Sequence, residues 1–266
     1  MKDYSHLPFG IRQLRTQWRT FRLSLKNARK AFRPGEILYH LGMKELDGYR
    51  VAYRKGTSDV KVLAHSFGND RFFPAVPEYQ PQPNHIIIDI GAHIGGFALV
   101  AAKKVPQGQV FAIEACLEAY DYLCVNIAMN RMDNIKAHHL ALTDQKGVLR
   151  LYHDDGNWGH SIMMPISPVW EETPSDTLTN YLAEQGLKSV DFIKMNCEGA
   201  EFPILMSTSV ALLKQVGCML IFYHADLSPR HTLADLRTHL ENAGFKTRLS
   251  HQEDDRGGLV AYRDPP

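Results

Sequence analysis

The sequence contains little that would mark a membrane-spanning, nucleic-acid-binding or disulfide-rich protein. Its formal net charge is only +1 over 266 residues, and no apolar run reaches the roughly 20 residues that cross a bilayer. The N-terminus has no apolar signal segment, and although it is Arg-rich and acid-poor like a transit peptide, it is also poor in serine. These absences predict a cytoplasmic protein with no transmembrane segment and no nucleic-acid partner.

Paired cysteines are also absent. The chain has four cysteines, none of them in a CxxC arrangement, and all stand in apolar sequence: Cys116, Cys124, Cys197 and Cys218. This pattern predicts reduced core thiols rather than a disulfide framework or a zinc site.

Charge of one sign is gathered in residues 1–33, which carry nine Lys or Arg and one acid, a net charge of +8 that leaves −7 for the rest. Within residues 11–32, apolar residues recur three and four apart, and basic residues follow one position later. The spacing predicts a basic amphipathic helix that ends at Pro34-Gly35. Four uses remain open: packing on its own domain, a homodimer seam, a cap that admits an anionic or carrier-bound substrate, or a membrane-surface helix.

Residues 1–80 are predicted to be an N-terminal extension that combines this helix with a hairpin. The hairpin is expected over residues 48–65, where apolar and polar residues alternate around residues 55–58. Four prolines in residues 74–84 then indicate an extended connection to the main domain, residues 81–266.

From residue 85 onward, short apolar runs alternate with helical patterns. This order predicts an α/β fold with a doubly wound, mainly parallel sheet that a terminal antiparallel hairpin closes. The hairpin is expected at residues 246–250 and 258–262, and a loop at residues 153–175. Strands are expected at 85–90, 109–114, 135–141, 148–152, 190–196 and 218–224, and helices at 97–105, 117–130, 178–185, 200–205, 209–214 and 233–243.

A glycine turn, residues 89–96, follows the first of these buried strands and precedes a helix. Gly91 and Gly95 would let the backbone approach a ligand closely, but their spacing is not the G-x-G-x-x-G of dinucleotide-binding proteins. Asp89 stands directly before the turn, where it could accept hydrogen bonds from a cationic amino group. Glu114 ends the next strand, the position from which an acid binds a ribose diol in doubly wound folds. The turn and Glu114 together predict a nucleoside-binding crevice. The glycine spacing and the expected terminal hairpin argue against a nicotinamide oxidoreductase.

A dense polar cluster ends the strand predicted at residues 190–196. Lys194, Asn196 and Glu198 alternate, so they would share one direction while the chain stays extended. A lysine in such a strand needs a partner, and Glu198, Glu201 and Asp191 are the expected ones. Because this strand should border the same crevice, these residues are candidates for a catalytic site.

These motifs resemble those of the FkbM-type methyltransferases. IDIGAHIGG is similar to that family's first motif, ALTDQKG to its ALSDxxG element, and DFIKMNCEGAE to its DxIKIDVEGAE element. FAIEAC takes the place of the family's VxAFEP-like second motif, and RKGTSD, before the core, resembles the family's upstream RxGTSD stretch. The resemblance covers about residues 50–224 and implies a class I fold that uses S-adenosyl-L-methionine (SAM). It places the cofactor against Asp89, Gly91, Ala92, His93, Ile94, Gly95, Glu114, Ala115, Ala141 and Asp144.

The resemblance also implies methylation of a hydroxyl on a small-molecule, natural-product or sugar acceptor. The predicted catalytic residues are His224, Glu198, Asn196 and Lys194, and His224 is the first candidate for the base because its ordinary pKa is nearest neutrality. Asn196 stands where the family has Asp, so no metal site is predicted and a divalent metal is not favoured. An N-methyltransferase and a non-catalytic SAM-binding protein are the alternatives. The predicted substrate-binding residues are Asn157, Gly159, His160 and Ser161.

Overall fold

The computed structural model describes residues 41–67, 72–153, 160–163, 165 and 168–264. The chain divides into two compact units. The larger unit comprises residues 43–53 and 57–266. The smaller unit comprises residues 1–42 and 54–56, and the structure describes only residues 41, 42 and 54–56 of it. The predicted helix over residues 11–32 therefore lies outside the described residues. Within the described ranges, no helix is long and apolar enough to cross a membrane.

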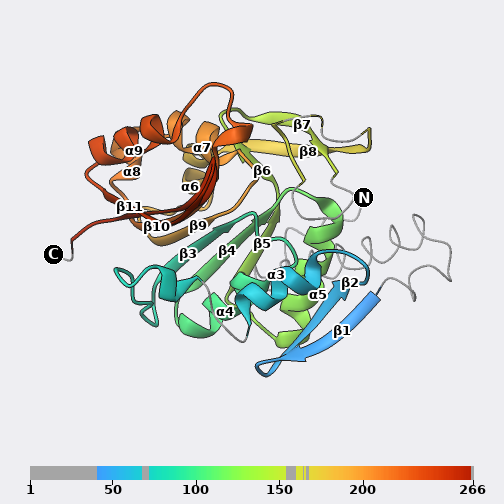
Figure 1. Cartoon of the computed structure of the whole chain (residues 1–266). Helices are drawn as coiled ribbons and strands as arrows, with labels where there is room; N and C mark the ends of the chain where they lie inside the picture. Colours follow the sequence, from blue (N-terminus) through green and yellow to red (C-terminus); the bar gives the residue numbers. More distant parts are fainter. Residues whose placement is uncertain (1–40, 68–71, 154–159, 164, 166–167, 265–266) are drawn as a thin grey trace, which may run out of the picture. The chain divides into compact units, whose positions relative to one another are not determined.

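A seven-stranded sheet in the order β11-β12-β10-β9-β3-β4-β5 forms the centre of the larger unit (Figure 1). Five neighbouring strands are parallel, whereas β12 runs antiparallel between β10 and β11. The predicted fold class, a doubly wound, mainly parallel sheet with a terminal antiparallel hairpin, is confirmed. The strands are β3 (Ile86–Ile90), β4 (Gln109–Glu114), β5 (Ile135–His139), β9 (Val190–Met195), β10 (Val216–His224), β11 (Lys246–Glu253) and β12 (Arg256–Tyr262).

Helices cover both faces of this sheet. One face carries α6 (Leu178–Glu184), α7 (Glu201–Ser207), α8 (Val210–Leu213) and α9 (Leu233–Asn242) (Figure 1). The other carries α3 (Asp59–Ser66), α4 (Gly96–Lys104) and α5 (Leu117–Asn130).

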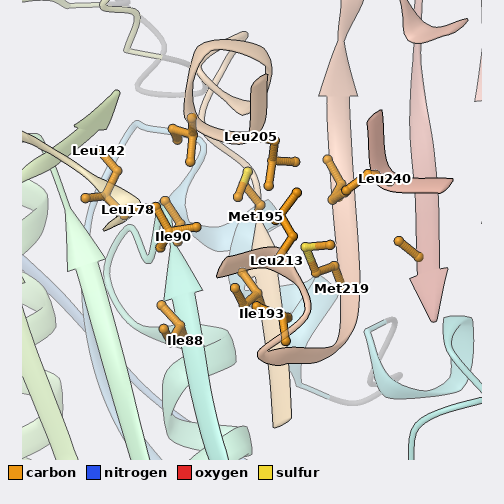
Figure 2. Packing of buried hydrophobic residues seen from close by; sticks show 14 of the residues in the cluster. Ile88, Ile90, Leu142, Leu178, Ile193, Met195, Leu205, Leu213, Met219 and Leu240 are labelled. Carbon is orange, nitrogen blue, oxygen red and sulfur yellow. The ribbon is translucent and has the colours of Figure 1, made fainter. Parts of the chain in front are cut away.

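Successive side chains of the central strands point to opposite faces. Ile88 of β3 belongs to the core beneath α6–α9, whereas its neighbour Ile87 belongs to the core beneath α3–α5. Figure 2 shows the first core, where Ile193 and Met219 on the strands meet Leu213 from the helix layer. This alternation explains why the strands read as continuous apolar runs.

A smaller three-stranded sheet is formed by β6 (Ala141–Thr143), β8 (Trp170–Thr177) and β7 (Gly147–Tyr152), in that order. The prediction of a loop over residues 153–175 is wrong from Trp170 onward, because β8 pairs with both β6 and β7. Polar residues such as Glu171 and Glu172 hid this strand, since only some of its side chains are buried.

The predicted hairpin over residues 48–65 is also wrong. The hairpin lies earlier in the chain, as β1 (Leu41–Leu46) and β2 (Tyr49–Arg54). Asp47 and Gly48 form its turn, with φ of +50° and +80°, as two-residue hairpin turns require. The second half of the predicted hairpin is helix α3, which Ser58 precedes.

Candidate functional site

A cavity of about 1420 Å³ lies at the carboxyl ends of β3, β4, β9 and β10. From β3 the chain continues to β4 and β5 on one side, and β9 and β10 lie on the other. The connection after β3 therefore runs toward β4, and the connection after β9 runs the opposite way, toward β10. This divergence leaves a crevice at the carboxyl ends of β3 and β9. Ligands of doubly wound folds bind at such a switch point.

The turn after β3 forms one wall of the cavity and brings two chain segments very close together. Gly91 has a φ of +75°, and a Cβ atom built on it would lie 2.0 Å from the backbone oxygen of Asn196. Asn196 in turn donates its backbone N–H to the carbonyl of Ile90 at 3.0 Å. Only glycine fits at position 91, because any side chain would push the end of β9 away from the turn.

A buried ion pair lies directly beneath this turn. Lys194 donates to Asp89 Oδ1 and to the carbonyl oxygen of Gly91, both at 2.9 Å. Burial raises the pKa of Asp89, and the nearby Lys194 ammonium opposes that rise. The expected partners of Lys194 were wrong: Asp191 instead accepts the N–H of Ile86 at 2.7 Å. Lys194 thus ties β9 to β3 and holds the glycine turn.

Glu114 presents a fixed carboxylate to the cavity. Its Oε2 accepts the backbone N–H of His93 at 2.7 Å, and its Oε1 accepts that of Cys116 at 2.9 Å. The side chain lines the cavity although Glu114 is only 8% exposed. Each oxygen keeps a second lone pair, so this carboxylate can accept further hydrogen bonds from a ligand.

His224, at the end of β10, lies between two carboxylates. Its Nδ1 is 3.2 Å from Glu201 Oε1, and its Nε2 is 3.5 Å from Glu198 Oε2. The Glu201 side chain is fully buried and also accepts the backbone N–H groups of Cys197 and Gly199, at 2.7 and 2.8 Å. Glu201 is therefore a fixed anchor that orients the imidazole, while Glu198 stands on the cavity side.

The two carboxylates change the acid–base properties of the imidazole. Burial alone would lower the pKa of His224, but the hydrogen bond that its ring donates to Glu201 and the charges of Glu201 and Glu198 outweigh this effect, so the pKa is raised. Burial likewise raises the pKa of Glu198, against the attraction of His224 and Arg256. Arg256 lies 4.0 Å from Glu198 and is itself paired with Asp226 at 2.7 Å, which extends this charged network to the cavity rim.

The structure brings most of the predicted site residues to one cavity. Twelve of them line it: Gly91, Ala92, His93, Glu114, Ala115, Ala141, His160, Ser161, Lys194, Asn196, Glu198 and His224. Four do not: Asp89, Ile94, Gly95 and Asp144. Asn157 and Gly159 lie outside the described residues.

The sequence analysis missed several residues that line the cavity or hold a lining residue in place. Glu201 was considered only as a partner for Lys194, although its spacing of three from Glu198 was visible. Arg248, His251 and Arg256 reach the cavity from the terminal hairpin. No local pattern in the sequence predicted that this hairpin lines the cavity, because its position depends on the antiparallel pairing of β12 with β10.

Comparison with known proteins agrees with this architecture. A sequence model described as "Methyltransferase FkbM domain" matches residues 89–247, more than half of the chain. The chain belongs to the FkbM methyltransferase family. The match begins at Asp89 and includes the glycine turn, the polar cluster after β9 and His224. The predicted resemblance to the FkbM-type methyltransferases and the predicted class I methyltransferase-like fold are thus confirmed. The chain carries a SAM-dependent methyltransferase domain.

The similar proteins are distant in sequence. Methyltransferase sdnD of Sordaria araneosa is 29% identical over 154 residues, 46% of this chain and 60% of that protein. The 2-O-methyltransferase NoeI of Sinorhizobium fredii is 24% identical over 178 residues, 60% of this chain and 68% of that protein. A crystal structure of methyltransferase FkbM from Methylobacillus flagellatus KT aligns with a TM-score of 0.49 and 16% identity, over 69% of this chain and 45% of that one. The chain therefore spans less than two thirds of sdnD and less than half of the solved protein.

The cavity suits SAM in its donor set. The Glu114 carboxylate is available for a ribose diol, and Ile113, Leu140 and Leu142 offer apolar surface for an adenine ring. At the other end, Asn196 and Glu198 offer oxygen acceptors for a cationic amino group or sulfonium. These residues fit the cofactor that the family uses.

Proposed function

We propose that this chain transfers a methyl group from SAM to a hydroxyl of a small-molecule acceptor, with His224 as the general base. The observation that carries the proposal is the placement of His224 at the cavity, with Nδ1 tied to the buried Glu201 and Nε2 directed toward Glu198. A histidine oriented by a buried carboxylate has one nitrogen left to accept a proton.

The chain's own residues supply orientation and proton transfer. SAM, when bound, would supply an electrophilic methyl group for transfer to the acceptor oxygen, with S-adenosylhomocysteine as the leaving group. His224 takes the hydroxyl proton at Nε2, and Glu201 stabilises the imidazolium through Nδ1. Alignment of the acceptor with the methyl group provides much of the remaining rate enhancement.

Glu114 would hold the ribose, and the turn at Gly91 would hold the methionine part of the cofactor. Lys194 acts through the turn that it supports. A divalent metal is not favoured at the transfer site, because Asn196 offers an amide rather than the carboxylate of the family motif.

The acceptor is proposed to be a natural product or a sugar. The name of NoeI, a 2-O-methyltransferase, supports transfer to oxygen. Phe72 and Phe222 line the cavity together with His251 and Arg256, a mixture of apolar and polar surface that suits a partly polar small molecule.

Calorimetry with SAM, S-adenosylhomocysteine and NADH tests the cofactor. We expect micromolar binding of both sulfur compounds and none of NADH. Glu114→Gln should weaken S-adenosylhomocysteine about 10-fold or more, since a charge-assisted hydrogen bond contributes about 1.5–3 kcal/mol. Failure of the folded protein to bind either sulfur compound would overturn the proposal.

Transfer of a labelled methyl group from SAM into panels of hydroxyl and amine acceptors tests the reaction. We expect labelled ethers, and a loss of about 10²–10⁴-fold in kcat in His224→Asn. Labelled amines alone would favour the N-methyltransferase alternative, and binding without any transfer would favour a non-catalytic protein.

Two further predictions concern the whole protein and stay proposals: a cytoplasmic location, and a homodimer through residues 11–32. The second can be tested by sedimentation of Trp18→Ser/Phe21→Ser, which should be monomeric. The same mass for the variant and the parent would contradict it.

A further inference from the structure

Three groups with a strong affinity for zinc meet outside the transfer site. Cys116 stands between β4 and α5, His153 directly follows β7, and His160 precedes the short bridge that pairs Ser161 with Tyr152. One ligand atom from each, a thiol sulfur and two imidazole nitrogens, lies within 4.8 Å of the other two. No local pattern in the sequence indicated this group, because the cysteine and the first histidine are 37 positions apart.

We propose that Cys116, His153 and His160 bind a zinc ion. Zinc favours sulfur and imidazole ligands at about 2.3 and 2.0–2.1 Å, so its tetrahedral ligands lie roughly 3.3–3.6 Å from one another. Side-chain rotations that move the ligand atoms by about an ångström bring them from within 4.8 Å to that spacing. Oxygen-preferring cations such as Mg²⁺ do not suit this ligand set.

The backbone around the ligands is fixed by hydrogen bonds, so the group is held in advance of binding. Tyr152 and Ser161 exchange both backbone N–H···O bonds, at 2.9 and 3.0 Å, which fixes the residues next to the two histidines. His153 also donates its own N–H to the carbonyl of Val169 at 2.9 Å. Cys116 donates its N–H to Glu114, as described above.

Cys116 is well placed to bind as a thiolate. It is the residue directly before the 14-residue helix α5, where the partial positive charge of the helix N-terminus stabilises an anion. Its side chain is buried, and the two histidines are half-buried, so the ion would be bound below the surface. Among the described residues, neither Cys124 nor Cys218 belongs to such a group.

A fourth group stands next to the three. Glu171 Oε1 lies 3.7 Å from His153 Nε2 and also accepts the backbone N–H of Leu117 at 3.0 Å. A carboxylate beside a metal-bound imidazole fixes the ring and increases its basicity. Glu171 can fix the His153 ring in this way, or it can bind the zinc ion as a fourth ligand. If Glu171 does not bind the ion, a water molecule can fill the fourth coordination position.

Zinc at this position would connect the start of α5, the end of β7 and the cavity wall. His160 and Ser161 both line the cavity, and Ser161 Oγ donates to the carbonyl of Glu198 at 3.5 Å. The ion would therefore hold this part of the wall against the charged network around His224, without touching His224 itself.

Titration of the full-length, reduced protein with ZnCl₂ in competition with a chromophoric chelator tests the proposal, and CoCl₂ serves as a spectroscopic probe. We expect one Zn²⁺ per chain, and with Co²⁺ a thiolate charge-transfer band and the intense visible bands of tetrahedral coordination. Cys116→Ser and His160→Asn should each weaken Zn²⁺ more than about 100-fold, and Glu171→Gln about 10–100-fold.

Matched controls separate this site from surface binding. Cys124→Ser, within α5, and His231→Asn should keep the wild-type affinity and Co²⁺ spectrum. Circular dichroism checks that each variant is folded. The proposal is overturned if the wild-type Co²⁺ complex lacks the thiolate band, or if Cys116→Ser keeps the wild-type affinity, since the bound ion would then be adventitious.

Discussion

At the scale of single residues, the acid–base behaviour of the site depends on how two carboxylates share one imidazole. Glu201 is fully buried, so its charge acts on His224 with little screening by water. Glu198 is partly exposed at the cavity, with a side-chain exposure of 19%. Glu201 is thus suited to hold the ring, and Glu198 is suited to adjust how readily the ring loses its proton.

This arrangement predicts the pH dependence of methyl transfer. A base must be unprotonated to accept a proton, and the pKa of His224 is raised, so activity should increase with pH through a value above the usual one of a histidine. Glu198→Gln removes a negative charge 3.5 Å from Nε2 and should move that increase to lower pH. The measurement is kcat against pH for both proteins with saturating SAM and acceptor.

The matched control is Glu253→Gln, which removes a carboxylate that lines the cavity from β11, whereas the carboxylates beside the His224 ring belong to Glu198 and Glu201. Its pH profile should keep the wild-type midpoint. A midpoint that moves upward in Glu198→Gln, or moves equally in both variants, would show that His224 does not act as the base.

Residue types could be predicted from the sequence, but their pairing could not. Lys194, Asn196 and Glu198, which the sequence analysis grouped at one strand end, line a single cavity together with His224. The partner of Lys194 was wrong because it lies across the sheet: Asp89 of β3 is in register with Lys194 of β9, 105 positions later. Strand order and register decide such pairs, and neither is visible in a local pattern.

At the scale of an element, the turn between β3 and α4 depends on glycine for two different reasons. Gly91 adopts a positive φ, which L-residues disfavour, and it also lies against the backbone of Asn196. Gly186, which follows the end of α6, adopts a similar φ of +68° but has no atom within 4 Å of an added Cβ. The two positions therefore separate the cost of the conformation from the cost of the contact.

Replacement of each glycine by alanine should give different losses in the free energy of unfolding. Gly186→Ala should cost about 1–2 kcal/mol, the penalty of a left-handed conformation alone. Gly91→Ala should cost more, because the backbone must also shift, and it should weaken S-adenosylhomocysteine binding while Gly186→Ala does not. Urea unfolding and calorimetry measure both effects, and equal losses with equal binding would contradict the role of the close approach.

Elements with a strong periodic pattern could be predicted, whereas those with a mixed pattern could not. The helix predicted at residues 117–130 matches α5 at both ends. The N-terminal hairpin was misplaced because the alternation of residues 50–54 was extended into α3, although Asp47-Gly48 is itself a hairpin signal. Strand β8 was missed because few of its side chains are apolar, and its first residue, Trp170, is 41% exposed and lies against Arg150.

At the scale of the whole molecule, the core beneath α3–α5 includes residues from before the predicted boundary at residue 80. Tyr79 is 6% exposed and stacks on Phe192 of β9, with ring centroids 4.5 Å apart. Phe73 packs on the same ring at 5.7 Å. The division into residues 1–80 and 81–266 stays a prediction, and this packing supplies a way to test it.

Tyr79→Ala in the full chain should lower the free energy of unfolding by about 3–5 kcal/mol, because a buried ring leaves a cavity beside a central strand. The exposed Val148→Ala, on β7, is the control and should change it by no more than about 0.5 kcal/mol. If the residues before 81 stabilise the methyltransferase domain, the loss will appear in its main urea transition and in the loss of S-adenosylhomocysteine binding at the same urea concentration. If those residues instead form a separate body, the transition that abolishes binding will keep its midpoint in Tyr79→Ala, and the boundary at residue 80 will stand.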